Sequence, residues 1–208
     1  MPTRVICVGT VESPCLRLVE TGDSVRGKYI ALSHCWGNLS KDQKFVTSAK
    51  NLNNRKEGIR FNEMPKSFQD AVIVTRALGV AYLWIDSLCI IQEDEADWEV
   101  ESAKMEEVFS LAYCTIAASY AKSSLEGFLG DRTPRACVAI QNSQRPVFYL
   151  AEAIDDFQAH VEQSVLNGRG WVLQERALSR RTIHFTSTQA YWECGEGIYC
   201  ETLTQLQK

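Results

Sequence analysis

Polar and aromatic residues gather where two apolar segments of this sequence end. The first segment ends in ALSHCWG (31–37), which contributes Ser33, Trp36 and Gly37. The second ends in WIDSLCIIQ (84–92), which contributes Asp86, Cys89 and Gln92. Open α/β sheets bind ligands beyond the carboxyl ends of their parallel strands, so we expect these residues to contact a substrate there. A buried aspartate is costly unless it is paired, so Asp86 either serves this site or caps a loop.

A third group, RGWVLQE (169–175), has the spacing of a functional carboxylate on a helix. Trp171 and Glu175 are four residues apart and share one helix face. A carboxylate beside an aromatic ring can have a raised pKa and suits acid–base or charge-stabilising roles. Arg169 either binds a phosphate or pairs with Glu175. The structural alternative is an Arg–Glu pair on a helix that buries its tryptophan.

Cysteine and metal chemistry have less support in the sequence. The chain has eight cysteines but no CxxC motif, and Cys194 and Cys200 lack the spacing of common zinc sites, so we expect no metal. Cys35 and Cys89 lie in apolar runs, where free cysteine behaves as a small hydrophobe. His34 and Cys35 are neighbours on a predicted strand and point to opposite faces, which argues against a Cys–His hydrolase.

Composition and motifs exclude several further classes. The net charge of −4 provides no general attraction for nucleic acid. No apolar run reaches the ~20 residues that span a bilayer, and Met1 to Gly9 does not resemble a signal peptide. Phosphate-binding loops and the HExxH and GxSxG motifs are absent from the sequence. We therefore expect a cytoplasmic protein with reduced thiols, no membrane span and no nucleic-acid partner.

The elements that position these residues follow the pattern of a parallel sheet. Strands are predicted at 28–36, 80–91 and 113–118, and an N-terminal hairpin at 3–8 and 15–20. A helix is predicted from Met64-Pro65 to Gly79, another after Asp97 as N-cap, and a short one near 45–52. Strands alternating with helices indicate an α/β fold with a parallel sheet flanked by helices.

The stretch 120–167 interrupts this alternation and is interpreted as an insertion. It is predicted to hold a hairpin of 136–141 and 146–151, which turns around Asn142 to Arg145, and a helix over 155–166. The pattern then resumes with a helix at 168–179 and strands at 182–186 and 189–194. We expect one domain over 1–208, with its core at 29–194 and extra strands near the termini, as the N-terminal part of a longer protein.

Four ordered blocks resemble the fungal heterokaryon-incompatibility (HET) domain. They are YIALSHCWG (29–37), MPKSFQDAVIVTRALGVAYLWIDSLCIIQED (64–94), DWEVESAKMEEVFSLAYCTIAAS (97–119) and RGWVLQERALSRRTIHF (169–185). One departure is Ile91, where the family usually has Asn before the Gln. The resemblance implies a role in fungal non-self recognition, in which activation triggers programmed cell death.

HET domains are similar in turn to Toll/interleukin-1 receptor (TIR) domains, which are flavodoxin-like and in some cases cleave NAD. Trp171 and Glu175 have the spacing of the tryptophan and catalytic glutamate of those enzymes. The resemblance thus implies Glu175 as catalytic residue, NAD as substrate without a further cofactor, self-association, and incompatibility or NLR-type proteins as partners. A non-catalytic signalling module that acts by homotypic assembly remains the alternative. An enzyme should place Ser33, Asp86 and Glu175 along one open cleft.

Overall fold

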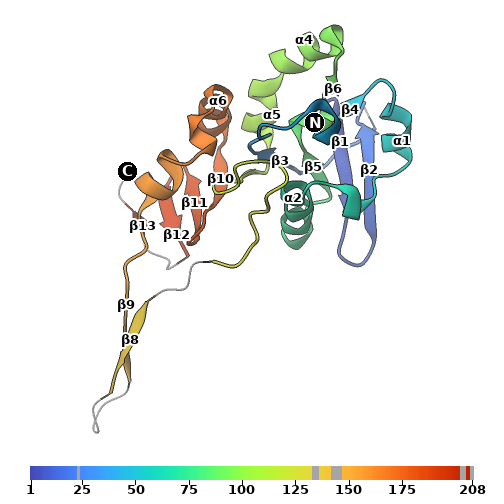
Figure 1. Cartoon of the computed structure of the whole chain (residues 1–208). Helices are drawn as coiled ribbons and strands as arrows, with labels where there is room; N and C mark the ends of the chain where they lie inside the picture. The colour runs from blue at the N-terminus through green and yellow to red at the C-terminus, as the bar shows by residue number, and fades with distance from the viewer. Residues whose placement is uncertain (23, 133–135, 142–146, 202–204, 207–208) are drawn as a thin grey trace.

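Four parallel strands form the centre of the structure (Figure 1). The computed structural model describes residues 1–22, 24–132, 136–141, 147–201 and 205–206. The parallel strands are β3 (Tyr29–Ser33), β5 (Tyr82–Trp84), β7 (Cys114–Ala117) and β10 (Arg181–Phe185). Their spatial order is β10-β7-β3-β5, which is flavodoxin-like: the chain passes from β3 to β5 on one side, and then back to β7 on the other side of β3. The predicted α/β class is confirmed, and the strand order puts a ligand-binding switch point at the end of β3.

Antiparallel strands extend the sheet on both sides. β1 (Arg4–Gly9) pairs with β5 and with β2 (Pro14–Glu20), as the predicted hairpin requires. On the other side, β11 (Ala190–Cys194), β12 (Gly197–Cys200) and β13 (Gln205–Leu206) follow β10. Nine strands within the described residues thus form one sheet. β12 and β13 were not predicted individually from the sequence.

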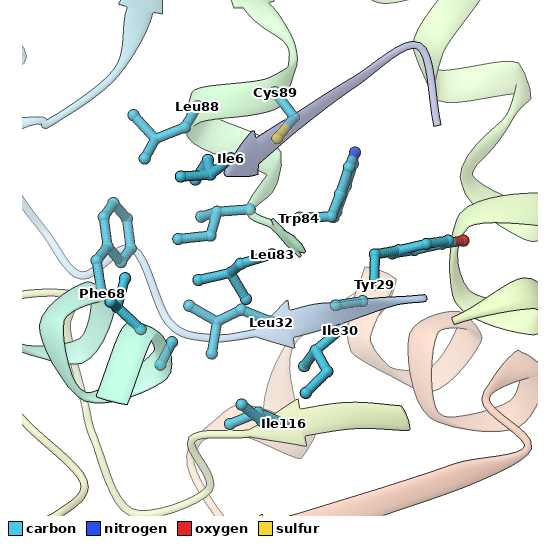
Figure 2. Packing of buried hydrophobic residues seen from close by; sticks show 14 of the residues in the cluster. Ile6, Tyr29, Ile30, Leu32, Phe68, Leu83, Trp84, Leu88, Cys89 and Ile116 are labelled. Carbon is cyan, nitrogen blue, oxygen red and sulfur yellow. The ribbon is translucent and has the colours of Figure 1, made fainter. Parts of the chain in front are cut away.

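Helices carry the chain between the parallel strands. α2 (Lys66–Ala77) leads from β3 to β5, α4 (Glu95–Ala103) and α5 (Met105–Leu111) lead to β7, and α6 (Gly170–Leu178) leads to β10. α2 begins after Pro65 and ends before Gly79, which has a φ of 67°, as the sequence predicted. Figure 2 shows Phe68 of α2 packed with Leu32 and Leu83, so the helix buries its apolar face on the sheet.

The prediction of one long strand over 80–91 is wrong. β5 ends at Trp84, and Asp86–Cys89 forms a helical turn, α3, before the short strand β6 (Ile91–Gln92). The Asp86 carboxylate accepts a hydrogen bond from the Ser87 backbone N–H at 2.6 Å, which favours the turn. Leu88 and Cys89 are nevertheless fully buried. A continuous apolar run does not distinguish a buried strand from a strand followed by a buried turn.

The helix after β5 also differs from the prediction. Its N-cap is Asp94, whose side chain accepts from the Asp97 backbone N–H at 3.1 Å. Asp97 instead binds Arg4 through its carboxylate. The helix is interrupted at Lys104, where α4 gives way to α5. The short helix predicted near 45–52 lies at Leu52–Glu57 (α1), beyond the two-residue strand β4 (Thr47–Ser48), which pairs with β6.

The insertion contains the predicted hairpin, formed by β8 (Cys137–Ile140) and β9 (Phe148–Ala151). The hairpin projects away from the sheet (Figure 1), and its predicted turn at 142–145 lies outside the described residues. The helix predicted at 155–166 is instead a π-helical turn at Gln158–Glu162 and a 3-10 turn at Leu166–Gly168. Within the described residues, no helix is long and apolar enough to cross a membrane.

Candidate functional site

A pocket of about 220 Å³ opens beside the carboxyl ends of β3 and β5. Six of its lining residues were predicted from the sequence: Trp36, Asp86, Gln92, Arg169, Trp171 and Glu175. They come from the loop after β3, from α3 and β6, and from α6 and the residue that precedes it. The pocket therefore lies at the carboxyl edge of the parallel strands, next to β3, which is one of the two strands that flank the topological switch point.

Glu175 is the buried acid of this pocket. Its residue surface is 8% exposed, although the helix that carries it lies at the surface. Burial raises the pKa of the Glu175 carboxyl to about 7, and the negative charge of Asp86 adds to the rise. The Ser33 hydroxyl and the Arg169 charge partly offset it. At neutral pH this carboxyl is therefore poised between its protonated and ionised forms.

Ser33 lies beneath the pocket rather than on its wall. The residue is 3% exposed, and it is close enough to Glu175 to lower the pKa of the carboxyl as a donor. The contact between Ser33 and the Glu175 carboxylate does not meet the geometric criteria of a hydrogen bond. Among the described residues, Ser33 Oγ therefore has no hydrogen-bond partner. The predicted cleft thus holds Asp86 and Glu175 on its surface, with Ser33 directly behind Glu175.

Asp86 is held in place by the loop after β3. The Trp36 indole Nε1–H donates to Asp86 Oδ2 at 2.8 Å. His34 Nδ1 lies 3.8 Å from Asp86 Oδ1, but burial lowers the pKa of His34 more than Asp86 raises it. His34 is therefore a neutral neighbour and not an ion-pair partner of Asp86. Asp86 thus accepts a backbone N–H within the α3 turn and also lines the pocket, so both alternatives for this carboxylate hold in part.

Arg169 fastens the start of α6 to the end of β3. Its guanidinium donates to the backbone carbonyl oxygen of His34, and the residue also lines the pocket. Arg169 lowers the pKa of Glu175 through its charge. The contact with His34 brings residues far apart in the sequence together at the switch point.

Aromatic side chains form the outer wall. Trp171 is 61% exposed and Trp98 is 53% exposed, and both line the pocket. Lys44 Nζ lies 5.5 Å from the centre of the Trp36 ring. Exposed indoles at the mouth of a pocket offer flat apolar faces on which a planar ligand ring can stack.

Cys89 and Gly37 are not part of the pocket lining. Cys89 is fully buried in the hydrophobic core (Figure 2), where burial raises the pKa of its thiol to about 12. Burial likewise raises the pKa of Cys35, which favours the protonated thiol over the nucleophilic thiolate. Gly37 has a φ of 82°, and a Cβ there would lie 2.4 Å from Ser123 Cβ. Gly37 therefore shapes the loop that carries Trp36.

Three pocket residues on the neighbouring helices were not predicted to contact a ligand: Trp98, Ser102 and Met105. Their spacing of three to four residues puts them on one face of a helix. The polar Ser102 within that apolar stripe was the available signal. In the part of the chain that the structure describes, no group of three or more His, Cys, Asp or Glu side chains could hold a metal ion.

Comparison with known proteins identifies the family. Neither the curated proteins nor the solved structures include a match to this chain. The family model described as Heterokaryon incompatibility protein (HET) matches residues 29–175, which begin at β3 and end at Glu175. This match covers more than half of the chain and every residue of the candidate site. The chain therefore belongs to the heterokaryon incompatibility (HET) family.

Proposed function

We propose that this domain is the effector of a heterokaryon incompatibility response and triggers cell death by hydrolysing NAD or a related nucleotide in a self-associated state. The observation that carries the proposal is the buried Glu175 carboxyl, with a pKa of about 7, at an aromatic pocket beside the switch point of the sheet. Incompatibility or NLR-type proteins in the cytoplasm are the proposed partners that bring copies together.

The proposed reaction breaks the bond between the ribose C1′ and the nicotinamide nitrogen. Nicotinamide leaves with the bonding electron pair, and water adds to the resulting oxocarbenium-like carbon and releases a proton. The ionised Glu175 stabilises the positive charge, and Asp86 provides a second carboxylate on the same pocket. Preorganised charge of this kind contributes several kcal/mol to lowering a barrier, on the order of 3 kcal/mol for one group.

The size of the pocket indicates which part of the nucleotide it holds. Pockets for whole drug-sized ligands have volumes of roughly 300–1,000 Å³, whereas this one has about 220 Å³. It suits the nicotinamide riboside end of the dinucleotide. Trp98 and Trp171 offer stacking surfaces at the mouth, and Arg169 offers a charge for the phosphates.

The test is release of nicotinamide from NAD by the assembled domain. Glu175→Gln should reduce turnover at least about 100-fold, the loss typical of one electrostatic catalytic group. Glu106→Gln, an exposed position on α5, is the matched control and should keep wild-type turnover. Absence of turnover by the assembled wild-type domain, or equal turnover by Glu175→Gln, would remove this mechanism.

A non-catalytic signalling module is the second candidate, and the exposed insertion favours it. Every residue of the strands β8 and β9 is exposed, including Phe148 at 56%, Tyr149 at 71% and Leu150 at 63%. Exposed apolar surface of this kind marks interaction sites. If assembly alone causes death, Glu175→Gln keeps killing in a cell-death assay, whereas Tyr149→Ser combined with Leu150→Ser abolishes it. The reverse pattern supports the enzyme.

A further inference from the structure

Two cysteines lie close together on the N-terminal hairpin. Cys7 of β1 pairs with Arg17 of β2, and Cys15 lies two residues before Arg17 on the same strand. Ile6 and Leu18 are the neighbouring pair, and both lie in the hydrophobic core. Because successive side chains of a strand point to opposite faces, Cys7 and Arg17 face away from that core. Cys15 is then a diagonal neighbour of Cys7.

The side chains of Cys7 and Cys15 interact. Burial raises the pKa of the Cys7 thiol, and Cys15 raises it further, both as a hydrogen-bond acceptor and through its charge. Cys7 therefore keeps its proton and directs it at the Cys15 sulfur, where it stabilises a thiolate. The charge of Arg17 lowers the pKa of Cys7, and a positive charge beside a thiol favours the reactive thiolate form.

An irregularity of the hairpin brings Cys15 over the end of β1. The register shifts after Cys7, so that Gly9 pairs with Pro14. Gly9 has a φ of 67°, and a Cβ there would lie 3.2 Å from Cys15 Cβ. Glycine in a strand often marks a bulge or a close approach of another part of the chain. Here the missing side chain leaves room for Cys15 beside β1.

Small molecules can reach this pair of thiols. Cys7 and Cys15 are both half-buried, and β2 is the outer strand of the nine-stranded sheet. The turn at 10–13 is exposed. The thiols of the parallel strands and of α3, by contrast, are buried. Thiol exchange requires access as well as a thiolate, so the hairpin pair combines the two conditions.

We propose that Cys7 and Cys15 are a redox site that closes reversibly to a disulfide by exchange with a small-molecule disulfide. The Cys15 thiolate attacks one sulfur of that molecule, whose S–S bond breaks, and the first small thiolate leaves with the bonding electrons. Cys7 then loses its proton and attacks the Cys15 sulfur, and the second small thiolate leaves. Both cysteines are oxidised, the small disulfide is reduced to two thiols, and the two cysteine protons end on those thiols.

Closure should stabilise the hairpin in its folded form. Arg76 of α2 already fastens the turn, because it donates to the Val8 carbonyl at 2.8 Å and to the Cys15 carbonyl at 3.4 Å. A covalent link between Cys7 and Cys15 reduces the freedom of the unfolded chain, so the oxidised protein should melt about 5 °C above the reduced one. Neither cysteine lines the pocket, so this inference does not depend on the proposed function.

The full chain, incubated with oxidised glutathione and then alkylated under denaturing conditions, tests the proposal directly. Trypsin releases residues 5–17 as one peptide, which contains Cys7 and Cys15 and no other cysteine. This peptide should lack alkyl groups and be about 2 Da lighter than its dithiol form, since two hydrogens are lost. Dithiothreitol should restore both thiols.

Cys194 and Cys200 are the matched control within the same chain. They also lie on adjacent antiparallel strands and share one tryptic peptide, 182–208. Cys194 pairs with Gly197 and Cys200 with Tyr191, so three register steps, about 10 Å, separate the two cysteines along the strands. This separation is too large for a disulfide, and both should be alkylated.

Single substitutions establish the order of the two steps. Cys7→Ser should stop at a mixed disulfide of Cys15 with glutathione, because no second thiol displaces the glutathione. Cys15→Ser should leave Cys7 unmodified under the same conditions, and an equal adduct on Cys7 would contradict the order. A wild-type peptide 5–17 that keeps two alkyl groups, carries glutathione or links to a second chain would overturn the site. An oxidised protein that melts no higher than the reduced one would also overturn it. None of these measurements uses NAD.

Discussion

The Trp36 indole donates a 2.8 Å hydrogen bond to Asp86 and so joins the chain segments that follow two adjacent parallel strands. Asp86 also accepts from the Ser87 backbone, which leaves its charge fixed at the pocket wall. Glu175 lines the same wall, and the Asp86 charge helps to raise the pKa of Glu175. Burial is the main cause of that rise, and the Trp36–Asp86 pair adds to it while it also shapes the pocket.

The two charged neighbours of Glu175 should shift its pKa in opposite directions. Asp86→Asn keeps an acceptor for Trp36 but removes a like charge, so the pKa of Glu175 should fall by about half a unit. Arg169→Gln removes an opposite charge, so the pKa should rise by a similar amount. A ¹³C NMR titration of the carboxyl measures both shifts. Asp131→Asn, at an exposed position, is the control, and shifts of the same sign in both variants would contradict this electrostatic account.

The stability of the domain should depend on pH through Glu175. The pKa of this carboxyl is about 7 in the folded chain and has its ordinary value of 4.5 when exposed. Folding therefore favours the protonated form, and the cost of burying the charge grows as pH rises from 4.5 to 7. Glu175→Gln removes this cost and should stabilise the domain by about 2 kcal/mol at pH 8, but little near pH 4.5. Urea unfolding at both pH values checks this, and an equal effect at both would be evidence against it.

Gly37 should be required for the loop that positions Trp36. Gly37→Ala places a Cβ 2.4 Å from Ser123 Cβ at a φ of 82°, so it should destabilise the domain by about 2 kcal/mol. Thermal unfolding measures the loss. Gly58→Ala is the matched control, because its φ of 179° is extended and its Cβ would have no atom within 4 Å. If both variants unfold at the same temperature as the wild type, the steric argument for Gly37 fails.

The N-terminal strand should stabilise the segment that shapes the pocket. Arg4 donates to the Cys89 carbonyl at 2.7 Å and to Asp97 at 2.5 Å, and it is 5% exposed. Arg4→Met leaves Asp97 without this partner and should cost about 3 kcal/mol in unfolding free energy. Asp97→Asn added to Arg4→Met should recover part of that loss, because the unpaired charge is removed. Additive losses in the double variant would show that the two side chains are not coupled.

Local patterns sufficed for the fold class and for six pocket residues. The alternation of apolar segments with helices indicates the parallel sheet. The four-residue spacing of Trp171 and Glu175 indicates a shared helix face, and both residues line the pocket. The same patterns failed at Asp86, because an apolar run does not reveal where a strand ends and a turn begins. Trp98 and Met105 were not predicted to line the pocket, because periodicity identifies a shared helix face but not what covers it.

The residue types alone determined which groups could do chemistry, but their tertiary environment decided which of them can. Cys89 and Glu175 are both buried, yet Cys89 lies in the core with its pKa raised to about 12, whereas Glu175 lines a pocket with a pKa of about 7. Ser33, Ala117 and His184 lie in register on three adjacent strands, although they are far apart in the sequence. Desolvation and strand register depend on segments far apart in the chain, so only the folded structure establishes them.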